Sequence, residues 1–377
     1  MSVEIKQISG NKDLREFIHF GIDHYKGNPY FVPPLVLDEM GTFNPRKNPV
    51  YDFCESVHFM AYRDGKPVGR IAGMINHRSN EKFNEKKARF GWIEFIDDPE
   101  VSDALLRAVE DWAAEKGQTE LNGPLGFTDL DYEGCLIEGF DQMGTASTIY
   151  NYPYYASHFE KHGYVKDADW VEFKIYIPEG IPDKHIRIGE IVKKKYNLTV
   201  VKPESRKRLL NEYGHQVFDL LNLAYANLYG FCELTERQIQ YYIKMYLPMV
   251  RLDCVRIILD GEKNVIGFGI AIPSLSRALQ KSQGKLLPFG FIHLLKALKG
   301  RNDVIDLYLI GVHPEYQSKG VNALLFTELI PQFIENGYHY AESNPELESN
   351  EKVQGQWDYF KREQHKRRRA FRKEIGK

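Results

Sequence analysis

The sequence predicts an α/β protein with mixed sheets, built from two tandem domains that repeat one order of elements. Three observations lead to this fold class. Short apolar runs typical of strands alternate with amphipathic helical patterns along the 377 residues. The two halves of the chain share the order of these patterns, and a chain of this length has room for two domains. Residues 307–326 join a buried strand, a turn and a helix in one stretch.

The composition is that of an ordinary soluble globular protein. Hydrophobic residues make up 43% of the chain and charged residues 27%, and the net charge of −2 gives no reason to expect a nucleic-acid partner. Charges occur throughout the first twenty residues, and no stretch approaches the roughly 18 apolar residues of a membrane span. Four scattered cysteines without C-x-x-C spacing predict reduced, buried thiols. We therefore expect a cytoplasmic protein with no metal site.

The first half reads as strands and helices followed by a long loop. Asp64-Gly65 predicts a hairpin turn, and Pro99 with its neighbouring acids predicts a helix that stops at Gly117. Strands are expected over residues 3–8, 58–62, 67–75, 89–96, 119–125 and 170–177, and helices near 11–18, 99–117 and 150–163. Residues 126–144 are poorly patterned and predict a long loop over a surface or a site.

The second half repeats this order with an insertion. Asp260-Gly261 predicts a second hairpin turn. Strands are expected over residues 198–202, 255–259, 265–272, 307–312 and 338–343, and helices over 206–227, 236–246, 286–299, 320–337 and 350–360. The segment 286–299 lies between the hairpin and the central strand of this half.

The segments after the two central strands indicate an internal duplication. Pro99 precedes Ala104 by five residues, whereas Pro314 precedes Ala323 by nine, so the first copy lacks four residues of the intervening loop. We predict an N-terminal domain over residues 1–178 that has lost this loop. The C-terminal domain, residues 179–377, keeps it.

The stretch 307–326 carries the strongest functional signal. A strand that passes through a glycine-containing turn into a helix aims free backbone N–H groups and the positive end of the helix dipole at one point. Such a point favours an anion, most often a phosphate. An ordinary strand–loop–helix crossover is the alternative.

The turn itself resembles a known motif. Val312, Pro314 and the run Gln317-Ser318-Lys319-Gly320-Val321-Asn322-Ala323 resemble the pyrophosphate loop of the GNAT superfamily, the acyl-CoA-dependent N-acyltransferases. That loop reads Gln/Arg-x-x-Gly-x-Gly/Ala; Gln317 and Gly320 match it, and Asn322 departs from it. The resemblance implies two tandem GNAT-like domains and an acyl-CoA cofactor, either acetyl-CoA or a longer acyl-CoA. Overall, the chain looks most like bacterial double-GNAT proteins whose substrates are mostly unassigned.

The resemblance also implies cofactor-binding residues. The cofactor's pantetheine arm would pair with the main chain of the central strand, and the pyrophosphate would sit on the loop. For Gly311, packing alone is the alternative to a close backbone approach. The implied residues are Ile310, Gly311, Val312, Gln317, Ser318, Lys319, Gly320, Val321, Asn322, Ala323 and Asn350.

Candidates for proton transfer are less well marked. Glu342, at the end of the strand after the cofactor helix, is a candidate general base, and His313 beside the loop is another. The family's thiolate acid is a tyrosine seven residues after an asparagine; counted from Asn350, that position holds Trp357. Tyr359 could replace it only if the helix register differs. Each candidate could instead be an ordinary solvated or structural side chain.

Two further segments have open interpretations. Residues 286–299 form a broad apolar helical face that suits a core helix, a membrane surface or a tunnel for a long acyl chain. Residues 361–377 hold nine Lys/Arg against two acids, which suits the phosphates of CoA, an anionic surface or a solvated terminal strand or tail.

The sequence supports three functional hypotheses. The first is an N-acyltransferase that transfers an acyl group from CoA to a small-molecule amine. The second is a long-chain enzyme that acts on an amino-lipid, such as a sphingoid base, and contacts a membrane peripherally. The third is a non-catalytic CoA-binding or partner-binding protein on a degenerate GNAT fold, favoured by Asn322, Trp357 and the shortened first copy.

Overall fold

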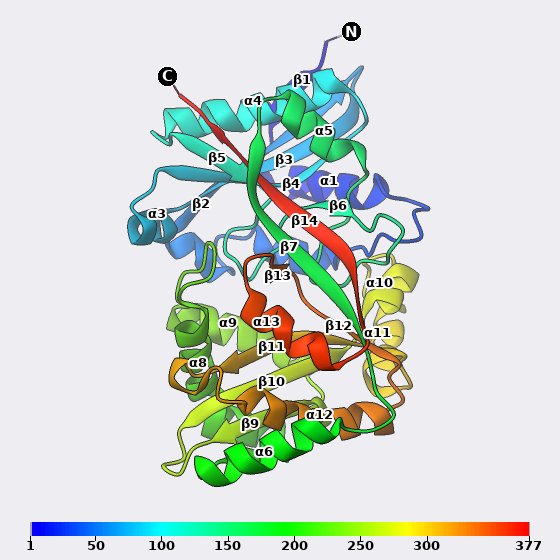
Figure 1. The fold of residues 1–377 in the computed structure, drawn as a ribbon. Coiled ribbons are helices and arrows are strands. Elements are labelled where there is room, and N and C mark those ends of the chain that lie inside the picture. Colours follow the sequence, from blue (N-terminus) through cyan, green and yellow to red (C-terminus); the bar gives the residue numbers. More distant parts are fainter. Residues whose placement is uncertain (1, 377) are drawn as a thin grey trace. The chain divides into compact units, whose positions relative to one another are not determined.

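The computed structural model describes residues 2–376, and the chain divides into two compact units (Figure 1). Unit 1 comprises Met1–Val171, Ser276–His293 and His365–Lys377, and unit 2 comprises Glu172–Leu275 and Leu294–Gln364. Two strands, β7 (Val165–Tyr176) and β14 (Arg362–Glu374), begin in one unit and end in the other. Each unit is a mixed sheet with helices packed on it, as the sequence predicted.

In unit 1 the strands pair in the order β1-β2-β3-β4-β5-β14. The bounds are β1 (Glu4–Gln7), β2 (Cys54–Arg63), β3 (Lys66–Asn76), β4 (Lys87–Phe95), β5 (Glu120–Gly123) and β6 (Cys135–Glu138), which pairs with β14. Neighbours are antiparallel except β4 and β5, which are parallel. The β2–β3 hairpin turns at Asp64 and Gly65, both with positive φ, which confirms the predicted Asp-Gly turn.

Helices pack on both faces of this sheet. They are α1 (Gly10–Asp23), α2 (Val36–Thr42), α3 (His77–Phe83), α4 (Pro99–Glu115), α5 (Tyr154–Lys161) and α10 (Ser276–Ser282), with a 3-10 turn at Pro49–Asp52. Leu105 and Val109 of α4 and Phe159 of α5 belong to one core cluster, and Phe17 and Ile18 of α1 belong to another. Their periodic apolar faces explain why these segments are helical and where they pack.

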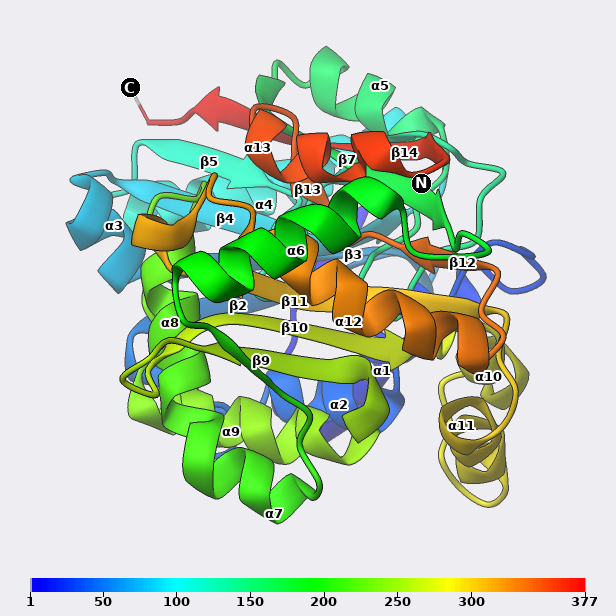
Figure 2. The same ribbon diagram turned by 60° about the horizontal axis from the view of Figure 1, so that its bottom comes forward.

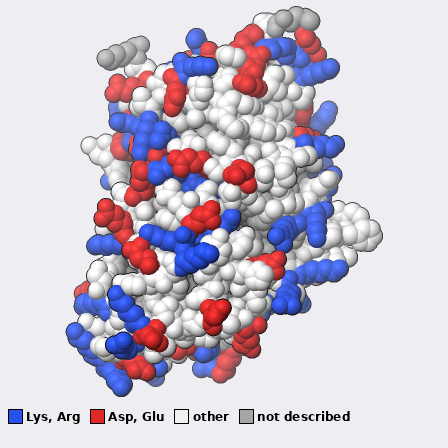
Figure 3. Space-filling view, turned by 45° about the vertical axis from the view of Figure 1, so that its right-hand side comes forward, with Lys and Arg blue, Asp and Glu red and all other residues white. Residues whose placement is uncertain are grey.

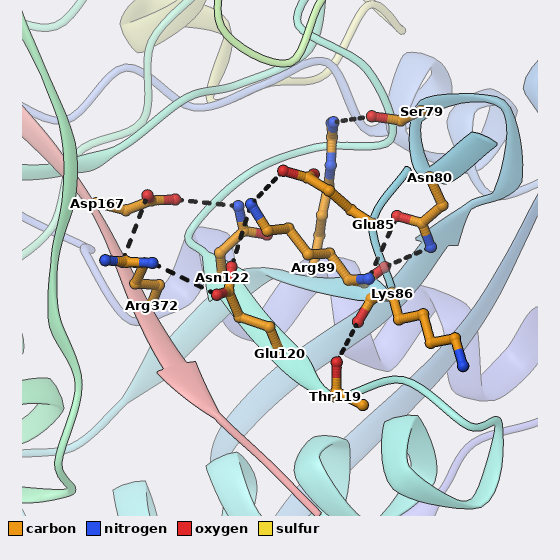
Figure 4. A network of polar contacts seen from close by, with 11 residues as sticks. Ser79, Asn80, Glu85, Lys86, Arg89, Thr119, Glu120, Asn122, Asp167 and Arg372 are labelled. Atoms are coloured by element: carbon orange, nitrogen blue, oxygen red, sulfur yellow. Dashed lines mark hydrogen bonds and ion pairs between the residues drawn. The ribbon is translucent and has the colours of Figure 1, made fainter. Parts of the chain in front are cut away.

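A polar network joins the beginnings of β4 and β5 to β14 (Figure 4). Lys87 forms ion pairs with Glu85 at 2.8 Å and with Glu120 at 3.2 Å. Arg372 of β14 reaches Glu120 at 3.5 Å, and Asn122 donates a hydrogen bond to Asp167 at 3.2 Å. These opposite charges neutralise one another, so the network stabilises the parallel strand pair.

In unit 2 the strands pair in the order β7-β12-β11-β10-β9-β8. The bounds are β8 (Thr199–Val201), β9 (Val255–Leu259), β10 (Val265–Pro273), β11 (Val304–Val312), β12 (Tyr340–Glu342) and β13 (Glu346–Leu347), which pairs with β7. β11 and β12 are the parallel pair. The second hairpin, β9–β10, confirms the turn predicted at Asp260-Gly261.

The helices of unit 2 again cover its sheet (Figure 2). They are α6 (Asp183–Lys195), α7 (Arg206–Arg208), α8 (His215–Tyr225), α9 (Glu236–Tyr246), α12 (Val321–Glu335) and α13 (Glu351–Gln354). A further helix, α11 (Gly290–Lys299), begins in unit 1 and ends in unit 2. Short 3-10 turns lie at Leu247–Met249, Leu252–Cys254, Pro314–Tyr316 and Gly355–Tyr359. α6 lies against α12, and Val192, Leu324 and Leu325 share a core cluster with Ile258 of β9.

Several elements differ from the predictions. The expected helix 206–227 is interrupted by a π-helical segment at Leu209–Gly214, and the expected helix 350–360 is the short α13 followed by a 3-10 turn. The expected loop 126–144 contains β6. Side-chain period alone does not separate α-helical from π- or 3-10 backbone, which explains the first two differences.

The basic stretch 361–377 is largely strand β14, and much of its charge is neutralised within unit 1. Arg369 Nε lies 2.8 Å from the Asp169 carboxylate, and Arg367 lies 3.3 Å from it. Arg368 and Lys366 are each only 1% exposed, and Lys366 Nζ donates to the carbonyl of Met143 at 3.2 Å. The interpretation as a terminal strand is therefore confirmed, whereas its solvation is wrong for Lys366 and Arg368, which are buried.

Two other predictions concern whole classes of residue. The four cysteines are buried thiols, as predicted, and no disulfide joins them. Among residues 2–376, none of the helices combines the length and apolar character needed to cross a bilayer.

The expected core helix at 286–299 is α11, in which Leu294 alone is buried, so the core interpretation is wrong.

Candidate functional site

One edge of β11 is open where the sequence predicted cofactor contacts. β10 pairs with β11 as far as Val312, whereas β12 pairs only with its first three residues, 304–306. Beyond Asp306, the β12 side of β11 has no strand partner in the described chain. An open edge offers backbone N–H and C=O groups to an extended ligand. Ile310, Gly311 and Val312 lie in this open portion.

Two carbonyl oxygens of β11 already accept side-chain hydrogen bonds. Asn344 donates to Tyr308 O at 2.6 Å, and the Tyr225 hydroxyl donates to Ile310 O at 3.1 Å. An arm lying along β11 would therefore bond to other main-chain groups or displace the Tyr225 hydroxyl. No local pattern marks Tyr225, because it lies 85 residues from its partner.

Gly311 is explained by packing. A Cβ atom at this position would lie 2.5 Å from Cε1 of Phe268, whose ring is fully buried. The backbone of Gly311 does not have a positive φ, so no special conformation requires glycine there. The sequence left open whether Gly311 serves packing or a close approach of the cofactor to the backbone. The geometry supplies a direct reason for packing.

The loop after β11 is held in a compact shape by its own residues. His313 Nδ1 accepts from the Glu315 amide at 3.3 Å, and the His313 carbonyl accepts from the Tyr316 amide at 2.7 Å. The Gln317 side chain donates to Val312 O at 3.1 Å. His313 and Gln317, both predicted site residues, thus shape the loop.

The loop ends in a cluster of backbone amides at the start of α12. Ser318 has a φ of 59° and Gly320 a φ of 84°, and Gly320 is the N-cap of this 15-residue helix without any side-chain cap. The amides of Ser318, Gly320, Val321 and Asn322 donate to no acceptor in residues 2–376. Successive free N–H groups at a helix N-terminus form an anion-binding concavity.

Lys319 adds a positive charge beside these amides. Its ammonium lies 5.4 Å from the Tyr196 ring centre and 5.5 Å from the Tyr316 ring centre. Cation–π contacts of this kind position an exposed lysine without neutralising it. The loop thus carries four free amides and one cation within residues 318–322.

The corresponding helix in unit 1 has its N-terminus closed. Three residues, 96–98, connect β4 to α4, whereas eight, 313–320, connect β11 to α12. The Asp98 carboxylate accepts from the Glu100 amide at 2.9 Å and pairs with Arg63 at 2.6 Å. An anion from the chain itself therefore caps α4. This supports the predicted loss of the loop in the first copy.

The strand edge in unit 1 is also filled. The Leu125 amide donates to Phe90 O at 2.8 Å, and a Cβ atom on Gly91 would lie 2.2 Å from Leu125 O. Trp92, with a φ of 42°, forms a bulge in β4 at this level. In unit 1, the chain after β5 thus covers the edge of β4, whereas the equivalent edge of β11 in unit 2 is open.

The predicted proton-transfer residues are spread over unit 2. Glu342 is 6% exposed at the end of β12, in register with Asp306 of β11 and Lys174 of β7. Tyr359 is 50% exposed, and its hydroxyl accepts from Lys184 of α6 at 2.7 Å. Glu342 thus adjoins the paired end of β11, whereas the contacts of Tyr359 lie with α6.

Asn350 and Trp357 have structural partners. The Asn350 side chain accepts from the Val353 amide at 3.4 Å and caps α13. Trp357 is buried, and its indole N–H donates to Glu346 at 2.8 Å. Burial raises the pKa of Glu346 to about 7, although this hydrogen bond and the charge of Arg362 oppose the rise. Glu346 is a titratable group that the sequence analysis did not identify.

Unit 1 contains a pocket that the sequence did not reveal, with a cavity volume of about 50 Å³. Arg70, Glu94 and Glu39 line it together with Trp92 and Tyr155. The one related sequence prediction was the long loop at residues 126–144, expected over a surface or a site. Gly126 and Tyr132 of this loop line the pocket.

The charges around this pocket are buried and interlinked. The Arg70 guanidinium pairs with Glu94 and donates to Phe17 O at 2.8 Å. Glu39, 4% exposed, accepts from the indole N–H of Trp92 at 2.7 Å. Burial raises the pKa of Glu39 to about 7, against the opposing influence of Arg70 and of the indole hydrogen bond. Glu94 thus pairs with the guanidinium directly, whereas Glu39 feels its charge without a direct contact to it.

Comparison with known proteins adds two relatives of similar length. No model of a known protein family matches the chain. Protein YghO of Escherichia coli (strain K12) is 28% identical over 378 residues, which covers 98% of this chain and 95% of the relative. The bacterial ceramide synthase of Caulobacter vibrioides is 28% identical over 313 residues, with 81% and 79% covered.

Solved structures identify the fold. A tandem GNAT protein from the clavulanic acid biosynthesis pathway matches with a TM-score of 0.59 at 14% identity, covering 100% of this chain and 99% of that one. The chain has the tandem GNAT fold. A glucosamine N-acetyltransferase region of a fungal β-N-acetylglucosaminidase also matches, with a TM-score of 0.57 at 12% identity, covering 99% of this chain and 38% of that one. Within this fold, the loop with free amides belongs to the second copy.

Proposed function

We propose that the protein is an acyl-CoA-dependent N-acyltransferase whose cofactor binds to unit 2. The observation that carries this proposal is the contrast between the two helix N-termini: Asp98 caps α4, whereas α12 begins with free amides beside Lys319. A pyrophosphate would accept hydrogen bonds from these amides, and its charge would be favoured by the helix dipole. The open edge of β11 would receive the extended arm.

The reaction joins an amine to the acyl carbon of a thioester. The neutral amine nitrogen attacks the carbonyl carbon, the carbonyl oxygen becomes an oxyanion, and the C–S bond breaks as the carbonyl reforms. The amine loses a proton, and the CoA sulfur leaves as a thiolate that takes up a proton. Glu342 and His313 remain our candidates for the base. For the acid, Tyr359 remains a prediction whose present contact is Lys184.

For the acceptor, we propose an amino-lipid. Its support is the relative from Caulobacter vibrioides, named a bacterial ceramide synthase, which is 28% identical over 81% of this chain. A ceramide is an N-acylated long-chain amino alcohol, so this acceptor and a long acyl-CoA are mutually consistent. A small-molecule amine with acetyl-CoA is the simpler alternative.

A non-catalytic CoA-binding protein is the competing function. Trp357 favours it, because a buried indole bonded to Glu346 replaces the tyrosine that the resemblance implied. Indole N–H is a donor without a usable acidic proton near neutral pH. A protein of this kind would bind CoA and release no acyl group.

The binding step can be tested by calorimetry with CoA and with pantetheine, which lacks the pyrophosphate. Lys319→Glu places a carboxylate beside the loop amides; we expect it to weaken CoA binding about five- to tenfold, or roughly 1 to 1.4 kcal/mol. Lys207→Glu, at another exposed lysine of unit 2, is the charge-matched control. Pantetheine binding should be equal in all three proteins. Equal CoA binding by both variants would place the pyrophosphate elsewhere.

A further inference from the structure

The segment around α11 exposes a cluster of large apolar side chains. Five of the fourteen exposed large hydrophobic residues of the described chain occur within residues 287–295: Leu287 (75% exposed), Phe289 (69%), Phe291 (42%), Ile292 (37%) and Leu295 (45%). Single exposed hydrophobic residues are normal, whereas a contiguous apolar patch marks an interaction site.

Residues 276–302, which contain this apolar cluster, carry charged side chains of positive sign only. No Asp or Glu occurs between Glu262 and Asp303, although acids make up 52 of the 377 residues of the chain. Residues 276–302 contain six Lys/Arg, and five of these form no ion pair with any described residue: Lys281, Lys285, Lys296, Lys299 and Arg301. Elsewhere, charges of both signs are intermixed over the face drawn in Figure 3. The positive charge of these five residues is therefore not neutralised by the residues that the structure describes.

The segment is anchored at its start. Leu279 of α10 is buried, and the Gln280 side chain donates to the carbonyls of Pro29 and Phe31 at 2.8 and 2.9 Å. The Gly284 carbonyl accepts from the Val36 amide at 3.0 Å. These contacts lie within unit 1 and hold the chain immediately before the exposed residues. The patch is thus presented by an ordered part of the fold.

We propose that residues 285–301 dock on the surface of an anionic lipid bilayer. Exposed Leu and Phe side chains can enter the boundary between head groups and acyl chains, and lysines beside them remain with the anionic head groups. A second copy of the chain fits less well: a two-fold symmetric contact would place this cationic patch against itself. An uncharged partner surface would leave the five cations without counter-charges.

Docking would also bring the protein to lipids that do not dissolve in water. If the proposed function holds, the amine acceptor would be drawn from that surface, and this consequence alone rests on the proposed function. Bilayer binding itself requires neither CoA nor turnover, so the two proposals can fail separately.

The test is vesicle co-sedimentation with the full chain, using phosphatidylcholine vesicles with and without phosphatidylglycerol. We expect binding to vesicles that contain phosphatidylglycerol, weak binding to neutral ones, and a loss of binding as salt is raised. Leu287→Ser with Phe289→Ser should lower the partition coefficient by roughly tenfold or more, because it removes apolar side chains that would enter the bilayer. Both side chains are mostly exposed in the free protein, so the fold should be unaffected. Lys296→Glu with Lys299→Glu should abolish the preference for anionic vesicles.

Matched controls keep the result specific. Ile191→Ser with Leu223→Ser removes two other exposed apolar side chains, and Lys193→Glu with Lys194→Glu makes the same charge change in α6. Both should bind vesicles like the unmodified protein. The proposal is overturned if the unmodified protein ignores anionic vesicles or if the Leu287/Phe289 variant binds as well as its control. It is equally overturned if sedimentation shows a dimer that this variant dissociates, since the patch would then join two copies.

Discussion

At the residue scale, Glu39 is a carboxyl group of unit 1 whose charge is constrained by the surrounding structure. It is almost fully buried, accepts a hydrogen bond from the indole of Trp92, and feels the charge of Arg70, which pairs with Glu94. Burial opposes ionisation more than Arg70 and the indole hydrogen bond favour it, so its pKa rises to about 7 from the ordinary 4.5. The proton on Glu39 is therefore part of the folded state at mildly acidic pH.

This gives a prediction for stability. Between pH 4.5 and 7 the folded carboxyl keeps its proton while the unfolded one has lost it, so the contribution of Glu39 to the unfolding free energy falls as pH rises through this window. The loss amounts to about 3 kcal/mol. Glu39→Gln keeps an acceptor for Trp92 and should be more stable than the unmodified protein at pH 8 by up to that amount, with little difference at pH 4.5.

Urea unfolding at several pH values measures this effect. Glu81→Gln, at an exposed glutamate of α3, is the control and should leave the pH dependence unchanged. A Glu39→Gln variant that follows the pH profile of the unmodified protein would show that Glu39 titrates normally in the folded state.

The sequence could indicate such residues only where a local motif marks them. Gln317 and Gly320 were found because the pyrophosphate motif is a short contiguous run. Glu39 carries no such mark, because its environment is assembled from Trp92, 53 residues away, and from Arg70. A raised pKa is a property of three-dimensional burial, which one-dimensional patterns do not report.

At the element scale, the unit formed by β11, the loop and α12 combines rigidity with free donors. Gln317 and His313 hold the loop through local hydrogen bonds, and Gly320 supplies the left-handed backbone at the helix start. Leu324 and Leu325 pack α12 into the core, which fixes the direction of its free amides. The loop is therefore held rigidly, as the proposed pyrophosphate site requires.

Gly311 tests whether this strand is limited by packing. Gly311→Ala would place a methyl group 2.5 Å from the buried ring of Phe268, so we expect a loss of about 1 to 3 kcal/mol in unfolding free energy. Gly267→Ala in β10 is the control, because its Cβ would make ordinary contacts of 3.4 Å and longer. Adding Phe268→Leu to Gly311→Ala should recover part of the loss. A Gly311→Ala protein of unchanged stability would rule out the packing explanation.

Element prediction succeeded where periodicity and turn chemistry coincide. The Asp-Gly hairpins and the helix beginning at Pro99 are in this class. Strand β14 was less evident because its basic residues alternate with few apolar ones; its charges are buried against Asp169, Glu110 and main-chain carbonyls. Long-range ion pairs can thus hold a basic segment inside a sheet. A local sequence pattern would assign the same segment to solvent.

At the scale of the whole molecule, the two copies of the fold have diverged in opposite ways. In unit 1, Asp98 caps the helix and the chain near Leu125 fills the strand edge, while a pocket with buried charges has formed nearby. In unit 2 the corresponding helix end and strand edge are open. The duplication was readable because the spacing between Pro99 and Ala104 could be compared with that between Pro314 and Ala323.

Domain organisation was harder to read than the duplication. A division at residue 178 remains a prediction for the two ancestral copies. By contacts, unit 1 also includes residues from Ser276–His293 and His365–Lys377. The inclusion of these later segments in unit 1 depends on long-range contacts, such as the strand pairing of Phe371 with Gly123. Contacts of this kind leave no local trace in the sequence.

The most direct test of the central claim is the release of CoA thiol in the presence of an amine. The protein would be given acetyl-CoA or palmitoyl-CoA together with a small primary amine or a sphingoid base in mixed micelles, and the product would be identified by mass spectrometry. We predict amine-dependent thiol release and a matching N-acyl product, greatest with palmitoyl-CoA and the sphingoid base, and reduced more by Lys319→Glu than by Lys207→Glu. Tight binding of CoA with no thiol release from any of these pairs would contradict the account and identify unit 2 as a CoA-binding module.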